Sequence, residues 1–137
     1  MAPGITPLKV FLADDSALIR TRVAAMLGAP SMDIVGQAQT PRACIDGILA
    51  THPDVVVLDV QLEGGMGLDV LKAVRAVDPG IAFVVFSNNS APAYRKRYLE
   101  QGAVRFLDKA TEFDQLAQAV AAAPGQLAHR IPRSKAI

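Results

Sequence analysis

The sequence is poor in cysteine, in net charge and in long apolar runs. Its single cysteine, Cys44, excludes a disulfide within the chain and favours a reducing, cytoplasmic setting. A net charge of +1 at pH 7 gives no reason to expect direct binding of nucleic acid. No stretch approaches the roughly 20 apolar residues of a membrane-spanning helix, and residues 1–7 lack the layout of a signal peptide, so we expect no membrane insertion.

The chain does hold enough apolar material for one folded domain. Of its 137 residues, 51% are hydrophobic and 20% are charged, a balance that excludes a disordered chain and leaves little room for a second domain. We expect residues 1–124 to form this domain, with a core of about 7–123. Residues 125–137 are expected to form a short basic tail, either solvated or a contact arm, with no output domain.

Short apolar runs alternate five times with longer segments of helical periodicity. The predicted strands cover residues 8–13, 33–38, 54–59, 81–86 and 103–107. The third of them is apolar throughout from Val55 to Leu58, as in a strand that is buried on both faces. This alternation predicts an α/β fold in which helices cover both faces of a parallel sheet.

Capping residues and helix breakers mark the ends of the predicted helices. Ser16, Thr40 and Thr111 are the predicted N-caps of the first, second and last helices. Pro124–Gly125 predicts the end of the last helix. The glycines between residues 64 and 67 predict a flexible loop after the third strand.

The predicted fourth helix, about residues 92–101, is the least apolar of the set. It carries three basic residues in a row at 95–97, and Tyr94 and Tyr98 one turn apart. Two interpretations stay open: an ordinary solvated basic face, or a surface that meets partner proteins, where tyrosine and arginine are enriched.

Polar residues follow four of the five predicted strands. Asp14 and Asp15 follow the first strand, Asp59 ends the third, Ser87 follows the fourth and Lys109 follows the fifth. Because ligand sites of open α/β sheets lie beyond the carboxyl ends of the strands, we expect these side chains to meet. Three neighbouring carboxylates would resist ionising together unless a cation lay among them, and an all-oxygen ligand set suits Mg²⁺.

This set of side chains has the chemistry needed to accept a phosphoryl group. The Asp59 carboxylate can attack phosphorus to give an aspartyl phosphate. The Ser87 hydroxyl can donate to a phosphoryl oxygen, and the Lys109 ammonium can neutralise one. Taken singly, each residue is better explained as a loop acid, a turn serine or a surface lysine; the hypothesis depends on the combination.

In these residues and their spacing the chain resembles the receiver domains of two-component response regulators, chemotaxis regulators among them. The matching segments are residues 9–16, 57–59 with Gly67 beyond them, 84–87 and 102–109. The resemblance covers about residues 7–123. It implies a flavodoxin-like (βα)5 three-layer sandwich with a parallel five-stranded sheet of order 2-1-3-4-5.

The resemblance also implies a role for each site residue. Asp59 would be the phosphoacceptor and would hold Mg²⁺ together with Asp15, while Asp14 would act through water. The backbone carbonyl of Gln61 would supply another metal ligand. Lys109 would contact the phosphoryl group, and the domain would assist its own phosphorylation and dephosphorylation without being an enzyme in the ordinary sense.

The implied switch and partners follow from the same family. Ser87 would move toward the phosphoryl group and Phe106 would be the rotating aromatic, so that the fourth helix, fifth strand and last helix form the signalling face. The donor would be a phosphohistidine on a sensor histidine kinase or a histidine phosphotransfer protein. The downstream protein is unknown, and a homodimer is a further candidate.

Several positions depart from the commonest family pattern. Phe106 lacks the hydroxyl that a tyrosine would bring, and Ala110 stands where a cis proline is usual. Glu63 stands where proline is frequent, which adds to the expected mobility of the loop. Gln61 and Asn89 would flank the path of the water that attacks the phosphoryl group.

Other classes of protein fit the sequence less well. An aspartate-nucleophile phosphohydrolase needs a second acid two residues after the nucleophile, but Gln61 follows Asp59 at that spacing. A flavin binder needs a phosphate cradle after the first strand, where Asp14 and Asp15 would repel phosphate. A fragment of a longer regulator and a phosphorylation-independent scaffold are the alternatives left open.

Overall fold

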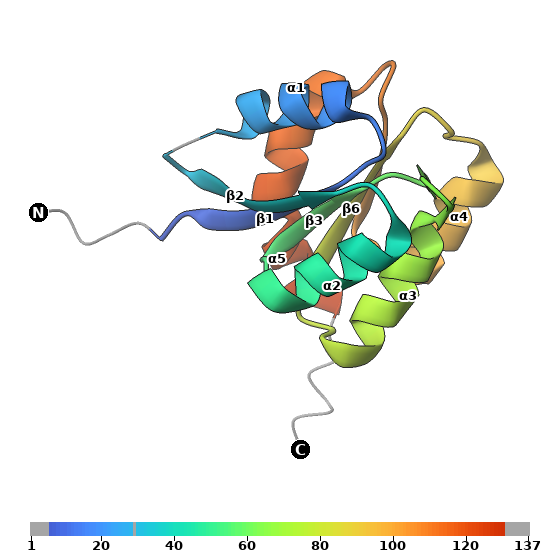
Figure 1. Cartoon of the computed structure of the whole chain (residues 1–137). Helices are drawn as coiled ribbons and strands as arrows, with labels where there is room; N and C mark the ends of the chain where they lie inside the picture. Colours follow the sequence, from blue (N-terminus) through green and yellow to red (C-terminus); the bar gives the residue numbers. More distant parts are fainter. Residues whose placement is uncertain (1–5, 29, 131–137) are drawn as a thin grey trace, which may run out of the picture.

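A five-stranded parallel sheet forms the centre of the molecule (Figure 1). The computed structural model describes residues 6–28 and 30–130. The strands are β1 (Leu8–Ala13), β2 (Met32–Ala38), β3 (Val55–Leu58), β6 (Ala82–Ser87) and β7 (Arg105–Asp108). They lie in the order β2-β1-β3-β6-β7, which is the predicted order 2-1-3-4-5 once only the strands of this sheet are counted.

Helices cover both faces of the sheet and complete three layers. The helices are α1 (Ala17–Leu27), α2 (Pro41–Thr51), α3 (Gly67–Val77), α4 (Pro92–Glu100) and α5 (Leu116–Arg130). Buried side chains of α1 and α5 belong to one apolar core, and those of α2, α3 and α4 belong to the other. The predicted flavodoxin-like sandwich is confirmed.

The central strand β3 serves both cores because its side chains alternate between the two faces of the sheet. Val55 and Val57 pack with α1 and α5, whereas Val56 and Leu58 pack with α2, α3 and α4. All four are at most 5% exposed. Burying each side chain completely contributes roughly 1.5–3 kcal/mol, which explains why an unbroken apolar run marks this strand.

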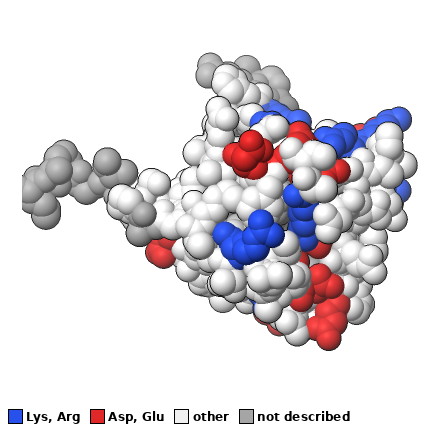
Figure 2. All heavy atoms as spheres, turned by 90° about the horizontal axis from the view of Figure 1, so that it is seen from above, with Lys and Arg blue, Asp and Glu red and all other residues white. Residues whose placement is uncertain are grey.

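Charged side chains are mixed over the surface. The face seen from above in Figure 2 carries acidic and basic groups in small clusters among other residues, in keeping with a formal net charge of +1. Within residues 6–28 and 30–130, no helix combines the length and the apolar character needed to cross a membrane.

Two of the three predicted helix caps are confirmed. The Ser16 hydroxyl accepts a 3.2 Å hydrogen bond from the amide of Ile19, and the Thr40 hydroxyl accepts one of the same length from Ala43. Thr111 is not a cap, so that prediction is wrong. A 3-10 turn, Phe113–Gln115, precedes α5 instead.

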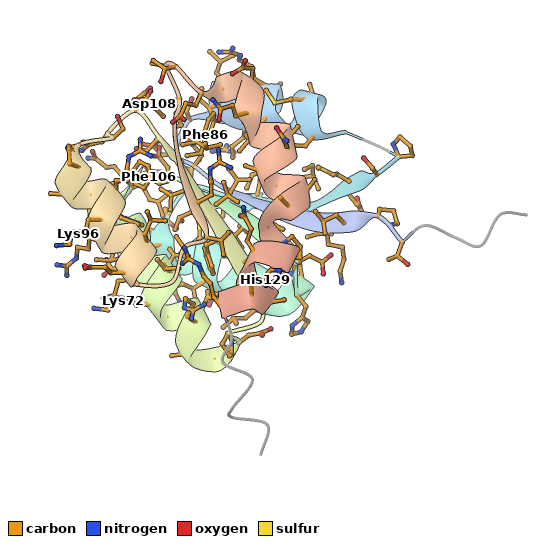
Figure 3. All side chains as sticks on the ribbon, turned by 180° about the vertical axis from the view of Figure 1, so that it is seen from behind. Lys72, Phe86, Lys96, Phe106, Asp108 and His129 are labelled. Carbon is orange, nitrogen blue, oxygen red and sulfur yellow. The ribbon has the colours of Figure 1, made fainter. Side chains whose placement is uncertain are left out.

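The last helix continues past the predicted end and runs to Arg130 (Figure 3), with Pro124 inside it. Local rules favour an end at Pro124–Gly125 because proline lacks an amide donor. Tertiary contacts outweigh that cost: Leu127 is buried, and the Arg130 guanidinium donates a 2.9 Å bond to the carbonyl of Ala103. Of the predicted tail, residues 131–137 lie outside the described residues.

A short antiparallel hairpin stands where the glycines predicted a loop. Its strands are β4 (Gln61–Leu62) and β5 (Gly65–Met66). The turn between them contains Gly64 at φ 81°, a backbone conformation that favours glycine. The hairpin carries the chain from Asp59 to the start of α3.

Candidate functional site

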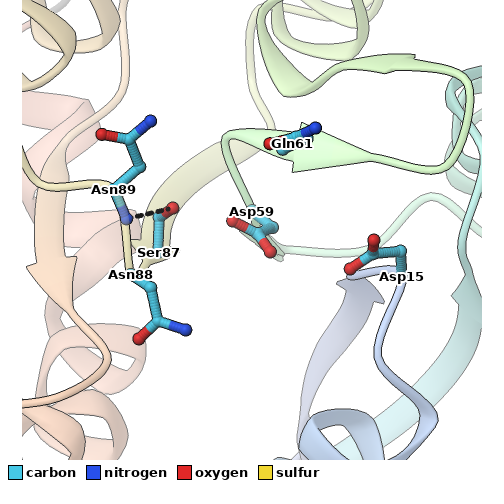
Figure 4. A pocket seen from close by; sticks show the side chains of 6 residues that line it. All are labelled: Asp15, Asp59, Gln61, Ser87, Asn88 and Asn89. Atoms are coloured by element: carbon cyan, nitrogen blue, oxygen red, sulfur yellow. Dashed lines mark hydrogen bonds between the residues drawn. The ribbon is translucent and has the colours of Figure 1, made fainter.

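An open pocket of about 190 Å³ lies at the carboxyl ends of the central strands (Figure 4). Its lining residues are Asp15, Asp59, Gln61, Ser87, Asn88 and Asn89. They come from the last residue of β6 and from the segments that follow β1, β3 and β6, where the crossover connections of a parallel sheet leave a crevice. Parts of the chain that are far apart in sequence therefore meet at one site.

Three carboxylates gather at this edge of the sheet. One carboxylate oxygen each from Asp14, Asp15 and Asp59 lies within 4.8 Å of the others. Asp14 and Asp59 are 6% and 8% exposed, whereas Asp15 is exposed. Asp15 is thus the carboxylate of the three that is open to solvent.

Lys109 joins the two buried carboxylates. Its Nζ atom lies 2.6 Å from Asp14 Oδ2 and 2.9 Å from Asp59 Oδ2. Burial by itself lowers the pKa of Lys109, but the hydrogen bonds and charges of Asp14 and Asp59 outweigh it and raise that pKa. The ammonium therefore stays charged, and its position between the two acids is fixed.

The charges of this cluster fit a divalent cation. Burial raises the pKa of Asp14, and the hydrogen bond from Lys109 offsets only part of that rise. When all three acids are ionised, the single ammonium leaves two negative charges without compensation. A hard divalent cation with oxygen ligands would neutralise them.

The two oxygens of Asp14 are already engaged. Oδ1 accepts a 2.9 Å hydrogen bond from the amide of Ser16, and Oδ2 forms a 2.6 Å ion pair with the ammonium of Lys109. Exposed Asp15 carries the next carboxylate along the chain. This difference between an engaged Asp14 and an exposed Asp15 fits the roles that the resemblance implies, in which Asp15 holds Mg²⁺ directly and Asp14 acts through water.

Ser87 lies across the pocket from the acids. The residue is 2% exposed, and its Oγ accepts a 3.1 Å bond from the amide of Asn89. Its backbone carbonyl accepts a 3.0 Å bond from the amide of Lys109. Ser87 therefore connects the β6–α4 loop to the strand end that presents the lysine.

The hairpin after Asp59 depends on a close approach of backbone to backbone. A Cβ atom at Gly67 would lie 2.0 Å from the carbonyl oxygen of Asp59, and the Gly67 amide donates a 2.7 Å bond to the carbonyl of Val60. Only glycine leaves room for this contact. The same hairpin places the Gln61 side chain on the pocket, opposite Asn89 (Figure 4).

Phe106 is buried beneath α4 and does not line the pocket (Figure 3). Its ring packs edge-on against Tyr98, with centroids 6.1 Å apart, and the Arg95 guanidinium lies 5.0 Å from its ring centroid. Arg95 Nη1 also donates a 2.9 Å bond to the carbonyl of Phe106. Phe106 is therefore held between the sheet and α4.

Tyr98 does not belong to an exposed partner surface, so that interpretation of the tyrosine pair is wrong for this residue. It is 1% exposed and packs in the core that α2, α3 and α4 share. The helical pattern could have revealed this, because Tyr94, Tyr98 and Leu99 form an i, i+4, i+5 stripe of large side chains on an otherwise polar helix. Tyr94 is partly buried against the same core.

Two further site residues were missed at the sequence level. Asn88 lines the pocket. Asp108 shapes the loop that holds Lys109: its Oδ1 accepts hydrogen bonds from the amides of Ala110 and Thr111, and its Oδ2 accepts one from the Ser90 hydroxyl. These bonds, that of Ser90 first, lower the pKa of Asp108. Asp108 thus orders the turn that contains Ala110.

The match to a known family agrees with this geometry. Residues 10–121 match the family model of the response regulator receiver domain. The chain belongs to that family, and its domain is a signalling domain of two-component systems.

Particular relatives support the assignment. Response regulator GacA of Pseudomonas aeruginosa is 29% identical over 114 residues, which cover 82% of this chain and 53% of the relative. A protein-glutamate methylesterase/protein-glutamine glutaminase of Cupriavidus metallidurans is 36% identical over 104 residues, which cover 74% of this chain and 29% of the relative. The chain thus spans about half or less of these curated relatives.

Solved structures show the same fold. The signal receiver domain of the response regulator NarL from Mycobacterium tuberculosis matches with a TM-score of 0.80 at 31% identity, covering 87% of this chain and 97% of that one. The response regulator domain of Thermotoga maritima CheB matches with a TM-score of 0.78 at 24% identity, covering 93% and 100%. The second match bears on the fold alone.

Proposed function

We propose that this domain is a phosphorylation switch that accepts a phosphoryl group on Asp59. The observation that carries the proposal is the contact of Lys109 with both Asp14 and Asp59, beside exposed Asp15 and an open pocket. A carboxylate nucleophile, an acidic cation site and a fixed ammonium are the parts that phosphoryl transfer to a carboxylate requires.

The proposed reaction transfers a phosphoryl group from a phosphohistidine to Asp59. An oxygen of Asp59 attacks the phosphorus of a phosphohistidine, the bond from phosphorus to the imidazole nitrogen breaks, and that nitrogen keeps the electron pair. The product is an aspartyl phosphate and a free histidine. Lys109, now beside Asp59 at 2.9 Å, would pair with an oxygen of the transferred group.

Receiver domains generally bind Mg²⁺, and the residues present fit it. Asp15 and Asp59 would hold the ion directly, Asp14 through water, and the backbone carbonyl of Gln61 would add a ligand. When bound, the ion would neutralise charge on the phosphoryl oxygens. Positioning and charge neutralisation account for most of the catalysis in such transfers.

Ser87 and Phe106 are the proposed switch residues. Ser87 would exchange the amide of Asn89, its present partner at 3.1 Å, for an oxygen of the new phosphoryl group. The β6–α4 loop would move with it, and Phe106 lies under α4, the helix that follows this loop. The face formed by α4, β7 and α5 would report the change, and Lys96 projects outward from that face (Figure 3).

Response regulators act between histidine kinases and downstream effectors. For this chain we propose a sensor histidine kinase or a histidine phosphotransfer protein as the donor, in the cytoplasm. A separate protein, a second copy of the chain or an effector domain in a longer regulator would receive the signal. Each of these would contact the α4–β7–α5 face.

Acetyl phosphate tests the proposal without a kinase. We would incubate the protein with Mg²⁺ and acetyl phosphate and measure its intact mass. We expect a gain of one phosphoryl group that EDTA prevents and that Asp59→Asn abolishes. Asp46→Asn is the matched control, because it makes the same change at an exposed position on α2 away from the pocket.

Two results would contradict the proposal. Equal uptake by Asp59→Asn would place the phosphoryl group on another residue. No uptake from acetyl phosphate, phosphoramidate or a phosphorylated histidine phosphotransfer protein would leave a scaffold that works without phosphorylation.

A further inference from the structure

The hydroxyl group of Tyr98 reaches the backbone beside Asp59. Tyr98 lies on α4, and its Oη donates a 3.2 Å hydrogen bond to the carbonyl oxygen of Val60, the residue after Asp59. The same carbonyl accepts the 2.7 Å bond from the amide of Gly67, the first residue of α3. One backbone oxygen therefore joins the loop after Asp59 to two helices.

The environment keeps this hydroxyl protonated. Burial raises the pKa of Tyr98 to about 12, and the nearby backbone amide of Leu68 offsets only part of that rise. The group is therefore a hydrogen-bond donor throughout the neutral pH range. At 1% exposure, solvent does not compete for the bond to Val60.

Tyr98 also touches the proposed switch residue. Its ring meets that of Phe106 at an interplanar angle of 74°. Phe106 has no hydroxyl, so within this aromatic pair only Tyr98 can form a hydrogen bond to the loop. Movement of Phe106 would act on Tyr98 through direct contact, because close-packed side chains cannot shift independently.

We propose that Tyr98 is a positioning residue that holds the backbone at Val60, and with it the Asp59 carboxylate, and that transmits movement of this loop to α4. The proposal rests on the proposed function and adds a residue to it. Tyr98 is not among the residues that line the pocket, and it acts through the backbone that carries Asp59.

The first test removes only the hydroxyl. We expect Tyr98→Phe to take up the phosphoryl group from acetyl phosphate roughly three- to tenfold more slowly at saturating Mg²⁺, the effect of one lost hydrogen bond. Circular dichroism and the Tm show whether the variant is folded. A purely structural role would lower the Tm and leave the uptake rate of the folded protein unchanged.

The second test uses Tyr98 itself as a probe. The chain has two tyrosines and no tryptophan, so Tyr94→Phe leaves Tyr98 as the sole tyrosine. We expect the fluorescence and the near-ultraviolet spectrum of Tyr98 to change when Mg²⁺ and beryllofluoride, a phosphoryl mimic, are added. The same spectra should stay unchanged in Tyr94→Phe combined with Asp59→Asn.

The outcomes separate this inference from the function on which it rests. Failure of the unsubstituted protein to take up a phosphoryl group overturns both. Normal uptake by the unsubstituted protein, with Tyr98→Phe at the same rate, overturns the positioning role alone. If the protein accepts the phosphoryl group but the Tyr98 spectrum does not change with beryllofluoride, the coupling to α4 is overturned. This measurement needs no substitution of Tyr98.

Discussion

At the scale of single residues, the site has two features. Glycine allows two backbone segments to approach closely, and several acids that repel one another lie side by side. Gly67 and Asp59 show the first feature, since their backbones touch. Asp14 shows the second: burial is the main cause that raises its pKa, and the charge of Asp59 raises it further. Positions of this kind have little freedom to change, which makes them useful for testing the geometry.

Gly67→Ala should damage both stability and phosphoryl uptake. The added methyl group would meet the carbonyl oxygen of Asp59 at 2.0 Å, and the backbone must move to relieve it. We expect a loss of about 1–3 kcal/mol in the free energy of unfolding, as for overpacked sites. Chemical denaturation measures this loss, and the acetyl phosphate assay measures the displacement of Asp59.

Gly125→Ala is the matched control with the opposite sign. Nothing lies within 4 Å of a Cβ atom there, and the residue is inside α5. Alanine in a helix is more stable than glycine by roughly 0.5–1 kcal/mol. A Gly67→Ala protein as stable as the Gly125→Ala protein would contradict the close approach at Asp59.

Cys44 should be chemically inert in the folded protein. It is fully buried, and burial raises its pKa to about 12. A free thiol has a pKa of about 8.5, so in alkaline solution the unfolded chain loses this proton first. The stability that Cys44 contributes is therefore complete below pH 8 and declines as the pH rises from about 8.5 toward 12.

Two measurements check this expectation. An alkylating reagent at pH 8 should label Cys44 in denaturant and leave the folded protein unmodified. The Tm should fall between pH 8.5 and pH 10, and Cys44→Ala should flatten that decline. Rapid labelling without denaturant would show that the thiol is accessible.

At the scale of elements, the sequence could predict what short-range patterns control. Apolar runs located the strands, and Ser16 and Thr40 located two helix starts, because strand burial and capping depend on residues close in sequence. The end of α5 was mispredicted because a distant carbonyl, that of Ala103, and a buried Leu127 stabilise the helix beyond Pro124. No local pattern contains such information.

The site residues also divide into those that short-range sequence patterns reveal and those that depend on contacts between distant parts of the chain. The sequence could single out five candidates, because each lies at the end of a strand, or just after one, that is itself easy to recognise: Asp14, Asp15, Asp59, Ser87 and Lys109. Asp108 and the hydroxyl of Tyr98 could not be singled out in this way. Their partners, Ser90 and Val60, become neighbours only when the chain has folded.

The extended part of α5 should contribute measurably to stability. We expect Leu127→Ala to lower the free energy of unfolding by about 2–5 kcal/mol, since Leu127 is 5% exposed and packs in the core with α1. His129→Ala, at an exposed position two residues on, should change it by less than about 0.5 kcal/mol. Equal effects in urea denaturation would mean that the helix ends at Pro124 in solution, as the sequence suggested.

At the scale of the whole molecule, the acidic site competes with stability. The three carboxylates lie within 4.8 Å of one another, and one ammonium compensates only part of their charge. Like charges at this spacing repel, and folding alone brings Asp59 to the sequence neighbours Asp14 and Asp15. Without a cation, this repulsion should therefore lower the free energy of unfolding of the domain.

Asp15→Asn should consequently have opposite effects with and without Mg²⁺. In EDTA the variant should melt roughly 3–6 °C above the unsubstituted protein, the shift expected for about 1 kcal/mol in a domain of this size. With millimolar Mg²⁺ the unsubstituted protein should gain stability through binding to its folded state, whereas the variant, which lacks the exposed carboxylate, should gain little. Thermal melts across a Mg²⁺ series would show the two curves crossing. A variant that is less stable in EDTA would mean that Asp15 is held by favourable contacts, and the acidic cluster would then have no electrostatic need for a cation.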